Sequence, residues 1–426
     1  MGFLYFQKRS VSPTDNGTGT NFFSPFNSFS NKPTPPAVTP PVDVSGYVPP
    51  AAPAQAKLMK ISTMPIAGFV AFSKERLKDV PVVPATPPPA ETTPTPATKK
   101  SKRVVPTPPL TEFVTALRYV AKSNGNIYQT FADKIQERKF STTVIPRVYD
   151  SYFGNHGNSV IMRYLKPDGQ TIETFVGNLP KELLGGDTTE NNEIKGSFLP
   201  NNIKDISISP DTLKAFYLSE TGDSMIGTAL NFSDNKKVQL LDSTFTEWLA
   251  QWPNKNILTF STKPSANVPG YMYTIDSTGK NLNKVLGNIN GLTTLESPNG
   301  KMILYGDSDL SLFIYHTDTR NSDKLGVKTL PEKCVWGGVS DVIYCAVPIL
   351  IDGNLYPDAW YQGEVSFSDQ IWKIDVKSGN TTMISDPATV AGGENIDGIK
   401  LALDEGENYL FFVNKKDSFL WKLDLK

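Results

Sequence analysis

One short pattern, a polar turn followed by two alternating strands, recurs along the chain and limits the possible folds more than any other feature. Its clearest copy spans residues 291–330 and holds the turn Ser297-Pro298-Asn299-Gly300. Alternation of apolar and polar residues predicts short strands, each with one buried face. The copy therefore indicates one four-stranded antiparallel blade. A single blade cannot bury both faces of its sheet, so the pattern requires neighbouring blades.

The turn of the pattern returns at a nearly constant spacing. From Asp211 to Asn254, to Asn299 and to Ser340 the distance is about 40–45 residues, the period of four-stranded propeller blades. Helical periodicity is almost absent from the same region. We therefore predict an all-β fold, a β-propeller of four-stranded antiparallel blades. The repeats begin near Ile66, Arg147, Asp205, Thr244, Leu292, Cys334 and Ile399.

The last repeat supplies only three strands, so the ring needs a strand from elsewhere to close it. Residues 57–63 alternate as an outermost strand does, and we predict that they pair with residues 419–425. Residues 66–72 would then be the innermost strand of the first blade, which gives a seven-bladed propeller. A six-bladed propeller stays open as an alternative, because a long structureless segment inside a blade counts against the assignment.

The chain before the repeats differs in composition. Residues 1–56 are a predicted disordered stalk rich in Pro, Ser and Thr, because such a segment cannot offset its ordering entropy. Residues 57–79 hold the closing strand and the first inner strand, residues 80–110 a Pro-rich linker loop, and residues 111–426 the remaining propeller. The start, MGFLYFQKRS, is too short for a transmembrane helix. It is either an ordinary disordered terminus or the trailing end of a membrane anchor that precedes Met1.

The balanced charge and the small number of His and Cys residues argue against nucleic-acid binding and against a zinc site. With 42 basic and 43 acidic residues the net charge is −1, so we expect no binding to nucleic acid. Two histidines, His156 and His316, and two cysteines cannot form a zinc site of the usual kind. No nucleophile or phosphate-binding motif occurs. We therefore predict no catalytic residues, no metal and no cofactor, and we leave enzymatic activity open.

The two cysteines, Cys334 and Cys345, flank the segment CVWGGVSDVIYC. A hairpin centred on Val339 and Ser340 places them directly opposite each other, at a cross-strand distance that suits a disulfide. Disulfides persist in oxidising compartments, so this bond would agree with an extracytoplasmic location. Two buried free thiols are the alternative.

The main insertion into the repeat spans residues 348–368, between the second and third strands of its blade. Because strands alternate in direction, this loop should share a face with the blade-to-blade connections. Exposed aromatic and acidic side chains at a propeller mouth indicate a recognition surface for protein, peptide or glycan. The alternative is that the aromatic side chains fold back as a hydrophobic plug. The binding-face candidates are Asp352, Tyr356, Asp358, Trp360 and Tyr361.

Two phrases carry a resemblance to a known family. They are SPDTLK at residues 209–214 and IWKIDVKSG at residues 371–379. Over about residues 111–426 the chain resembles the TolB-like branch of the WD40-type propellers, although it lacks the Gly-His and Trp-Asp dipeptides of true WD40 repeats. The whole chain also resembles a family of membrane-anchored propeller proteins of bacteria with reduced genomes. The resemblance implies the propeller fold and no particular activity.

These features together predict a non-enzymatic, monomeric, extracytoplasmic propeller that binds a protein or a cell-envelope component through one face. Membrane contact is expected only through the N-terminal anchor, if one precedes the stalk. One alternative is a hydrolase or lyase that acts on an envelope polymer through carboxylates in the central channel. Another is a structural component of the cell surface. The charged residues expected on the innermost strands are Asp150, Asp205, Glu247, Glu296, Lys400 and Asp404.

Overall fold

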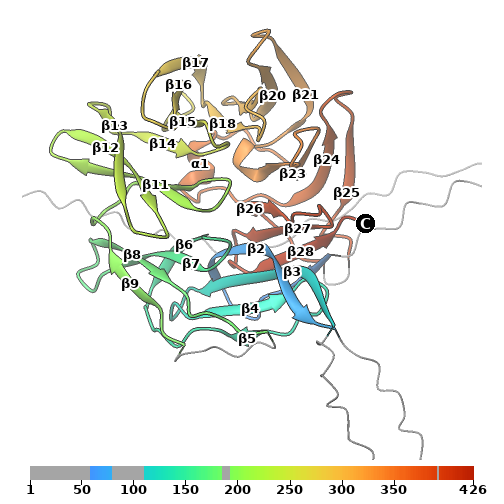
Figure 1. Ribbon diagram of the computed structural model, residues 1–426. Coiled ribbons are helices and arrows are strands. Elements are labelled where there is room, and N and C mark those ends of the chain that lie inside the picture. The colour runs from blue at the N-terminus through green and yellow to red at the C-terminus, as the bar shows by residue number, and fades with distance from the viewer. Residues whose placement is uncertain (1–57, 79–109, 185–191, 391–392) are drawn as a thin grey trace, which may run out of the picture. The chain divides into compact units, whose positions relative to one another are not determined.

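The computed structural model describes residues 58–78, 110–184, 192–390 and 393–426, which form seven four-stranded sheets arranged in a ring (Figure 1). Strands pair antiparallel within each sheet. The seven-bladed β-propeller is therefore confirmed, and the six-bladed alternative is wrong. The stalk predicted over residues 1–56 lies outside the described residues, and so does the Pro-rich linker loop except for Leu110.

Each of the first six blades runs in chain order from its innermost to its outermost strand. The first blade holds β2 (Ile66–Leu77), β3 (Thr111–Ala121), β4 (Ile127–Phe131) and β5 (Arg138–Lys139). The second holds β6 (Val148–Gly154), β7 (Ser159–Leu165), β8 (Ile172–Asn178) and β9 (Lys195–Phe198). The third holds β10 (Asp205–Ile208), β11 (Lys214–Thr221), β12 (Ser224–Asn231) and β13 (Lys237–Ser243). The fourth holds β14 (Trp248–Gln251), β15 (Ile257–Thr262), β16 (Pro269–Asp276) and β17 (Asn283–Asn290). The fifth holds β18 (Thr293–Glu296), β19 (Met302–Gly306), β20 (Ser311–His316) and β21 (Ser322–Lys328). The sixth holds β22 (Cys334–Trp336), β23 (Val342–Pro348), β24 (Asp369–Asp375) and β25 (Thr381–Ser385).

The seventh blade joins the two ends of the described chain. Its strands are β26 (Gly398–Leu403), β27 (Tyr409–Asn414), β28 (Leu420–Asp424) and, outermost, β1 (Leu58–Lys60). Leu58 lies opposite Leu423, and Lys60 lies opposite Trp421. The Lys60 ammonium also lies 5.1 Å from the centroid of the Trp421 ring, a distance at which a cation and an aromatic face attract. The predicted closure by an N-terminal strand is confirmed.

The innermost strand of the first blade is longer than predicted. It was expected to end at residue 72, but β2 continues to Leu77 and stays paired with β3. Arg76 holds this two-stranded extension to the rest of the blade: its guanidinium donates to Asp133 at 2.9 and 2.5 Å and to Glu112 at 2.9 Å. The same group lies 5.1 Å from the centroid of the Phe131 ring. These side-chain contacts are not visible in the strand alternation.

The recurring turn has a physical cause. In the third blade the Ser209 hydroxyl donates to Asp211 at 2.6 Å and accepts from the Lys214 backbone N–H at 2.9 Å. In the fifth blade the Ser297 hydroxyl does the same with Asn299 at 2.8 Å and the Met302 N–H at 3.0 Å. One hydroxyl thus closes the hairpin between the first two strands. Short polar side chains that bond to nearby backbone are what such turns require.

The hydrophobic core consists of layers between neighbouring blades. Phe216 of the third blade meets Phe260 of the fourth edge to face, with ring centroids 5.5 Å apart. Between the second and third blades the Phe232 ring packs directly on Gly154, where any Cβ atom would lie 2.0 Å from that ring. A larger residue at position 154 would therefore push the two blades apart.

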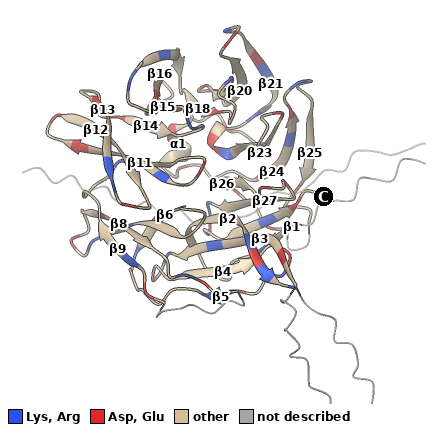
Figure 2. Cartoon of the chain, in the orientation of Figure 1, with Lys and Arg blue, Asp and Glu red and all other residues tan. Residues whose placement is uncertain are grey.

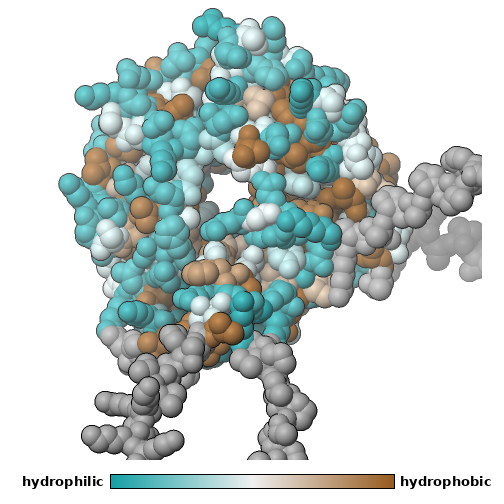
Figure 3. Space-filling view, turned by 45° about the vertical axis from the view of Figure 1, so that its right-hand side comes forward, coloured by the Kyte–Doolittle hydropathy of each residue, from teal (hydrophilic) through white to brown (hydrophobic). Residues whose placement is uncertain are grey.

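The ring encloses a hollow centre and has two faces (Figure 3). We call the face at which the innermost strands begin the insertion face, because it carries residues 349–368 as well as the blade-to-blade connections. The other is the opposite face. Basic and acidic residues are scattered over all parts of the ring (Figure 2). Within the described ranges, no helix has the length and apolar character needed to cross a membrane.

Candidate functional site on the insertion face

Residues 349–368, which we call the insertion, connect β23 to β24 and contain the one-turn helix α1 (Asp358–Tyr361). Tyr356, Trp360 and Phe367 are buried and pack together with Leu330, in the connection into the sixth blade. The Trp360 and Phe367 rings stack with centroids 6.4 Å apart. α1 lies toward the centre of the ring (Figure 1). The insertion is thus packed onto the propeller through its aromatic side chains.

A buried group of charges lies beneath the insertion. The Lys333 ammonium, at the end of the 3-10 helix η1 (Pro331–Lys333), donates to Asp369 at 2.8 Å, to Asp397 and to the Gly398 carbonyl at 3.1 Å. The side chains of Lys333, Asp369 and Asp397 have no exposed surface. The Trp360 indole donates to Asp397 at 3.0 Å, so the helix of the insertion is tied to this group.

A disulfide joins the strand after Lys333 to its neighbour. Cys334 and Cys345 lie opposite each other in β22 and β23 and are bonded, as predicted. Both cysteines are therefore used, and the alternative of two free thiols is wrong. Such a bond persists in an oxidising compartment, which supports an extracytoplasmic location.

Two further contacts hold the inner edge of the insertion. The Tyr361 hydroxyl bonds to the Glu332 carboxylate, and the Lys415 ammonium donates to the Trp360 carbonyl. Lys415 also lies 3.8 Å from the centroid of the Trp360 ring. Because these partners come from the connections into the sixth blade and within the seventh, the insertion is fixed at both sides.

The insertion also reaches the fourth blade. The Asp358 carboxylate accepts a hydrogen bond of 2.6 Å from the Ala266 backbone N–H, in the loop between β15 and β16. A groove of about 460 Å³ lies between this loop and the insertion. Polar side chains and backbone line it together with one exposed leucine: Ser265, Asn267, Asn354, Leu355, Gln362 and Glu364.

The insertion also exposes apolar side chains to solvent. Leu350 has 73% of its surface exposed, and Ile349, Leu355 and Tyr361 are also exposed. Val268, beside the groove, is exposed in the same way. Exposed apolar side chains on a loop that is itself well anchored are typical of surfaces that bind a partner.

The five binding-face candidates divide into two groups. Tyr356 and Trp360 are 2% and 4% exposed, so they have the positions expected of a hydrophobic plug and do not offer their rings to solvent. Asp352 and Tyr361 are exposed, and Asp358 is half-buried against the fourth blade. Three of the five side chains therefore remain accessible at the mouth.

Acidic residues also line the channel at the insertion face. Asp205 is half-buried, and Glu332 is exposed as a residue although protein atoms crowd its carboxyl group. This loss of hydration raises the pKa of each carboxyl to about 6, and the charge of Asp205 adds to the raised pKa of Glu332. Asp150 differs because the Lys400 ammonium lies 2.5 Å away, which holds the pKa of Asp150 below its usual value against the effect of burial.

The remaining inner-strand charges do not join this group. Glu247 forms an exposed ion pair of 3.2 Å with Lys263. Asp404 accepts from the backbone N–H groups of Asn408 and Tyr409 at 2.7 and 2.8 Å, so it closes a turn on the opposite face. In the part of the chain that the structure describes, no three His, Cys, Asp or Glu side chains lie close enough to hold a metal.

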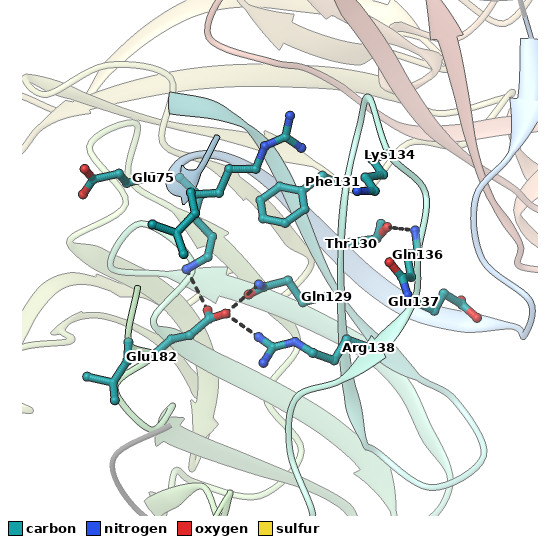
Figure 4. A pocket seen from close by; sticks show the side chains of 13 residues that line it. Glu75, Gln129, Thr130, Phe131, Lys134, Gln136, Glu137, Arg138 and Glu182 are labelled. Atoms are coloured by element: carbon teal, nitrogen blue, oxygen red, sulfur yellow. Dashed lines mark hydrogen bonds and ion pairs between the residues drawn. The ribbon is translucent and has the colours of Figure 1, made fainter. Parts of the chain in front are cut away.

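The opposite face has a different pocket, of about 420 Å³, beside the first and second blades (Figure 4). At its wall the Glu182 carboxylate accepts from Lys74 at 2.7 Å, from Gln129 and Arg118 at 3.0 Å each, and from Arg138. Arg118 is 2% exposed, and burial lowers its pKa to about 10 despite the Glu182 charge. The three cations outweigh the burial of Glu182 and hold the pKa of this carboxyl below its usual value.

Several of these residues were missed by the sequence patterns. Arg118 lies inside the apolar strand β3, and Lys333 precedes a buried strand. A charge within a run of core residues implies a buried partner, and that signal could have marked both residues. Their partners Glu182, Asp369 and Asp397 lie 36 or 64 positions away, so no local spacing connects them.

No family model matches the chain, and no curated protein matches it. Among solved structures it is similar to an oligogalacturonate lyase in complex with manganese, with a TM-score of 0.49 and 11% identity over 73% of this chain and 85% of that chain. It is also similar to an oligogalacturonate lyase from Vibrio parahaemolyticus, with a TM-score of 0.46 and 9% identity over 74% of this chain and 86% of that chain. At such identities the similarity concerns the fold alone.

Proposed function

We propose that this protein is a recognition module that binds a protein partner of the cell envelope through the insertion face. One observation carries the proposal: the insertion is anchored on the fourth, sixth and seventh blades, yet it exposes apolar side chains beside a groove of about 460 Å³. A surface of fixed shape with apolar anchors binds at a smaller entropic cost than a mobile loop. The Cys334–Cys345 disulfide supports a location outside the cytoplasm.

The proposal includes the expectations from the sequence that concern the whole chain. The stalk over residues 1–56 would hold a monomeric propeller away from a membrane, and the resemblance to TolB-like, membrane-anchored propellers supports this arrangement. The absence of a nucleophile motif in the sequence supports a binding role rather than catalysis.

The experiment compares two exposed apolar residues on the two faces. Leu350, on the insertion, is 73% exposed, and Val339, in the hairpin of the same blade on the opposite face, is 76% exposed. Purified wild type, Leu350→Ser and Val339→Ser are used to capture partners from detergent-solubilised envelope, with quantitative mass spectrometry. We expect a partner that is recovered by wild type and Val339→Ser and reduced at least about tenfold with Leu350→Ser, because this variant loses the most exposed apolar anchor of the insertion. Equal recovery by all three proteins would contradict the proposal.

The carboxyl groups of the channel favour a second candidate function, the cleavage of an envelope polysaccharide. Asp205 and Glu332 have pKa values raised to about 6, and carboxyls with raised pKa are typical of acid–base chemistry. The test is incubation with isolated envelope polysaccharide at pH 6, followed by an assay for new reducing ends. Activity that disappears in Glu332→Gln but persists in Glu247→Gln, an exposed residue at the same mouth, would favour catalysis over binding.

A further inference from the structure

The buried group around Lys333 forms a salt bridge, and it also contains the functional groups that a reaction between an amine and a carboxyl group requires. One ammonium and two carboxylates, from Asp369 and Asp397, are in contact, and none of the three side chains has exposed surface. The Lys333 nitrogen lies 2.8 Å from Oδ2 of Asp369. An amine held this close to a carboxyl group has the proximity that an intramolecular reaction requires.

The surroundings keep water away from these groups. The rings of Trp360 and Phe367 each lie with their centroid 5.3 Å from the Lys333 nitrogen. Leu310, Leu330 and Tyr356 complete the apolar wall, and all are buried. In such a site two opposite charges are less well solvated than in water, and a neutral product is favoured over an ion pair.

The two carboxylates are not equivalent. Asp397 accepts three further hydrogen bonds through Oδ2, from the Trp360 indole at 3.0 Å, the Phe367 N–H at 3.1 Å and the Ser366 hydroxyl at 3.2 Å. These donors and the Lys333 ammonium keep the pKa of Asp397 below its usual value although burial opposes this. Burial raises the pKa of Asp369, and its Oδ1 atom is buried without any hydrogen-bond partner. The surroundings thus favour the protonated form of Asp369 and the ionised form of Asp397.

We propose that Lys333 and Asp369 condense to an intramolecular amide bond, with Asp397 as the proton carrier. The Lys333 ammonium passes one proton to Asp397, and the free amine attacks Cγ of Asp369. The new N–Cγ bond forms, Asp397 gives its proton to Oδ1 and takes one proton from the nitrogen, and the Cγ–Oδ1 bond breaks to release water. Of the four protons present at the start, three on nitrogen and one on Oδ1, one stays on the amide, two leave in water and one remains on Asp397. Nothing is oxidised or reduced.

The atom that would carry negative charge in the intermediate already has a donor. Oδ2 of Asp369 accepts a hydrogen bond of 2.7 Å from the Gly398 backbone N–H. A fixed N–H at a developing oxyanion lowers the barrier to acyl transfer. The unpartnered Oδ1 is then the oxygen that leaves, because no protein group has to release it.

The bond would link Asp369, the first residue of β24 after the insertion, directly to Lys333 in the connection before β22. Together with the Cys334–Cys345 disulfide it would tie the start of the sixth blade twice, once in a way that reductants cannot undo. Its formation does not depend on whether the insertion binds a partner.

The first experiment measures the mass of the full-length protein after denaturation and reduction of the disulfide. The amide predicts a mass smaller than that of the sequence by one water, and a branched peptide that joins Lys333 to Asp369 in a protease digest. A succinimide at Asp397-Gly398 would lose the same mass, but hydroxylamine cleaves a succinimide and leaves an amide intact. The full sequence mass, a hydroxylamine-sensitive product or a branch at Asp397 would each overturn the proposal.

The second experiment separates the roles with two variants. Lys333→Arg keeps a buried cation but has no amine to acylate, so its protein should retain the full sequence mass. Asp397→Asn keeps the amine and Asp369 but removes the proton carrier, and we expect the linked fraction after purification to fall at least about tenfold, as for loss of a general base. Circular dichroism checks that both variants fold. Complete linkage in Asp397→Asn would show that Asp397 has no part in the reaction.

Discussion

Two glutamates near the opposite face, Glu182 and Glu296, both keep their side chains largely away from solvent, but they differ in their partners. The side chain of Glu182 is 3% exposed and contacts Lys74, Arg118 and Arg138, whereas Glu296 is 5% exposed and has one carboxylate oxygen with no hydrogen-bond partner. The cations hold the pKa of Glu182 below its usual value, while burial raises the pKa of Glu296 from 4.5 to about 7. Burial alone therefore does not fix the charge of a side chain in this ring.

The difference shows how the propeller uses its charges. Glu182 comes from a loop of the second blade and contacts side chains of the first, so it joins two consecutive blades of the ring. Glu296 ends the innermost strand β18, and its Oε2 atom is buried without a hydrogen-bond partner. We infer that Glu182 stabilises the fold at neutral pH and that Glu296 destabilises it.

The largest effect is expected when Glu182 is removed. In Glu182→Ala the buried Arg118 loses its only carboxylate among the contacts that the structure describes. An unpaired buried charge typically costs about 3–5 kcal/mol of unfolding free energy. Urea unfolding at pH 7 measures it. A loss below about 1 kcal/mol would mean that water hydrates Arg118 and that the comparison with Glu296 fails.

The second prediction concerns Glu296, whose replacement should raise the unfolding free energy rather than lower it, by an amount that depends on pH. The pKa of Glu296 is higher in the folded than in the unfolded protein, so the folded state binds more protons between pH 4.5 and about 7. As far as Glu296 is concerned, the unfolding free energy of the protein is therefore highest below pH 4.5 and falls as the pH rises toward 7. Glu296→Gln should raise the unfolding free energy by about 2–3 kcal/mol at pH 8 and leave it nearly unchanged at pH 4.

The control for this prediction is the pH dependence itself. Urea unfolding of wild type and Glu296→Gln is measured at intervals from pH 4 to pH 8. A stabilisation of equal size at both ends of the range would show that the amide packs better than the carboxyl, and that the ionisation of Glu296 is not the cause.

The comparison also explains what the sequence could predict. Alternation and turn spacing act locally, so they located six of the seven innermost strands within a few residues and the register of Cys334 with Cys345. The closing strand was predictable because the last repeat supplies only three strands, so the seventh blade needs a fourth strand at its outer edge. The extension of β2 to Leu77 was missed because it depends on Arg76 and its distant acidic partners.

The candidate site was predictable only in outline. The insertion was visible as a break in the repeat, but the inward turn of Tyr356 and Trp360 depends on Phe367, Leu330 and the buried Asp397. Nothing in the strand pattern distinguishes an aromatic side chain that faces solvent from one that covers its own blade. The partners of Lys333 and Arg118 were likewise set by packing within and between neighbouring blades rather than by local sequence.

A smaller effect is expected when one cation of three is removed. Lys74 lies 2.7 Å from Glu182, and its side chain is 17% exposed. In Lys74→Met the carboxylate keeps Arg118 and Arg138, so the unfolding free energy should fall by about 1 kcal/mol. The pKa of Glu182, followed by NMR titration of a selectively labelled sample, should rise. An unchanged pKa would mean that the two arginines alone determine the charge of Glu182.

The smallest effect is expected at a carboxylate that is paired but not buried. Glu220 lies 3.1 Å from Lys204, and both side chains are more than two-fifths exposed. Water screens this pair, so Glu220→Ala should change the unfolding free energy by no more than about 0.5 kcal/mol. Salt separates the two cases, because exposed pairs weaken with ionic strength and buried ones barely respond. A loss at Glu220 as large as that at Glu182, and independent of salt, would show that pairing rather than burial sets the contribution of these carboxylates.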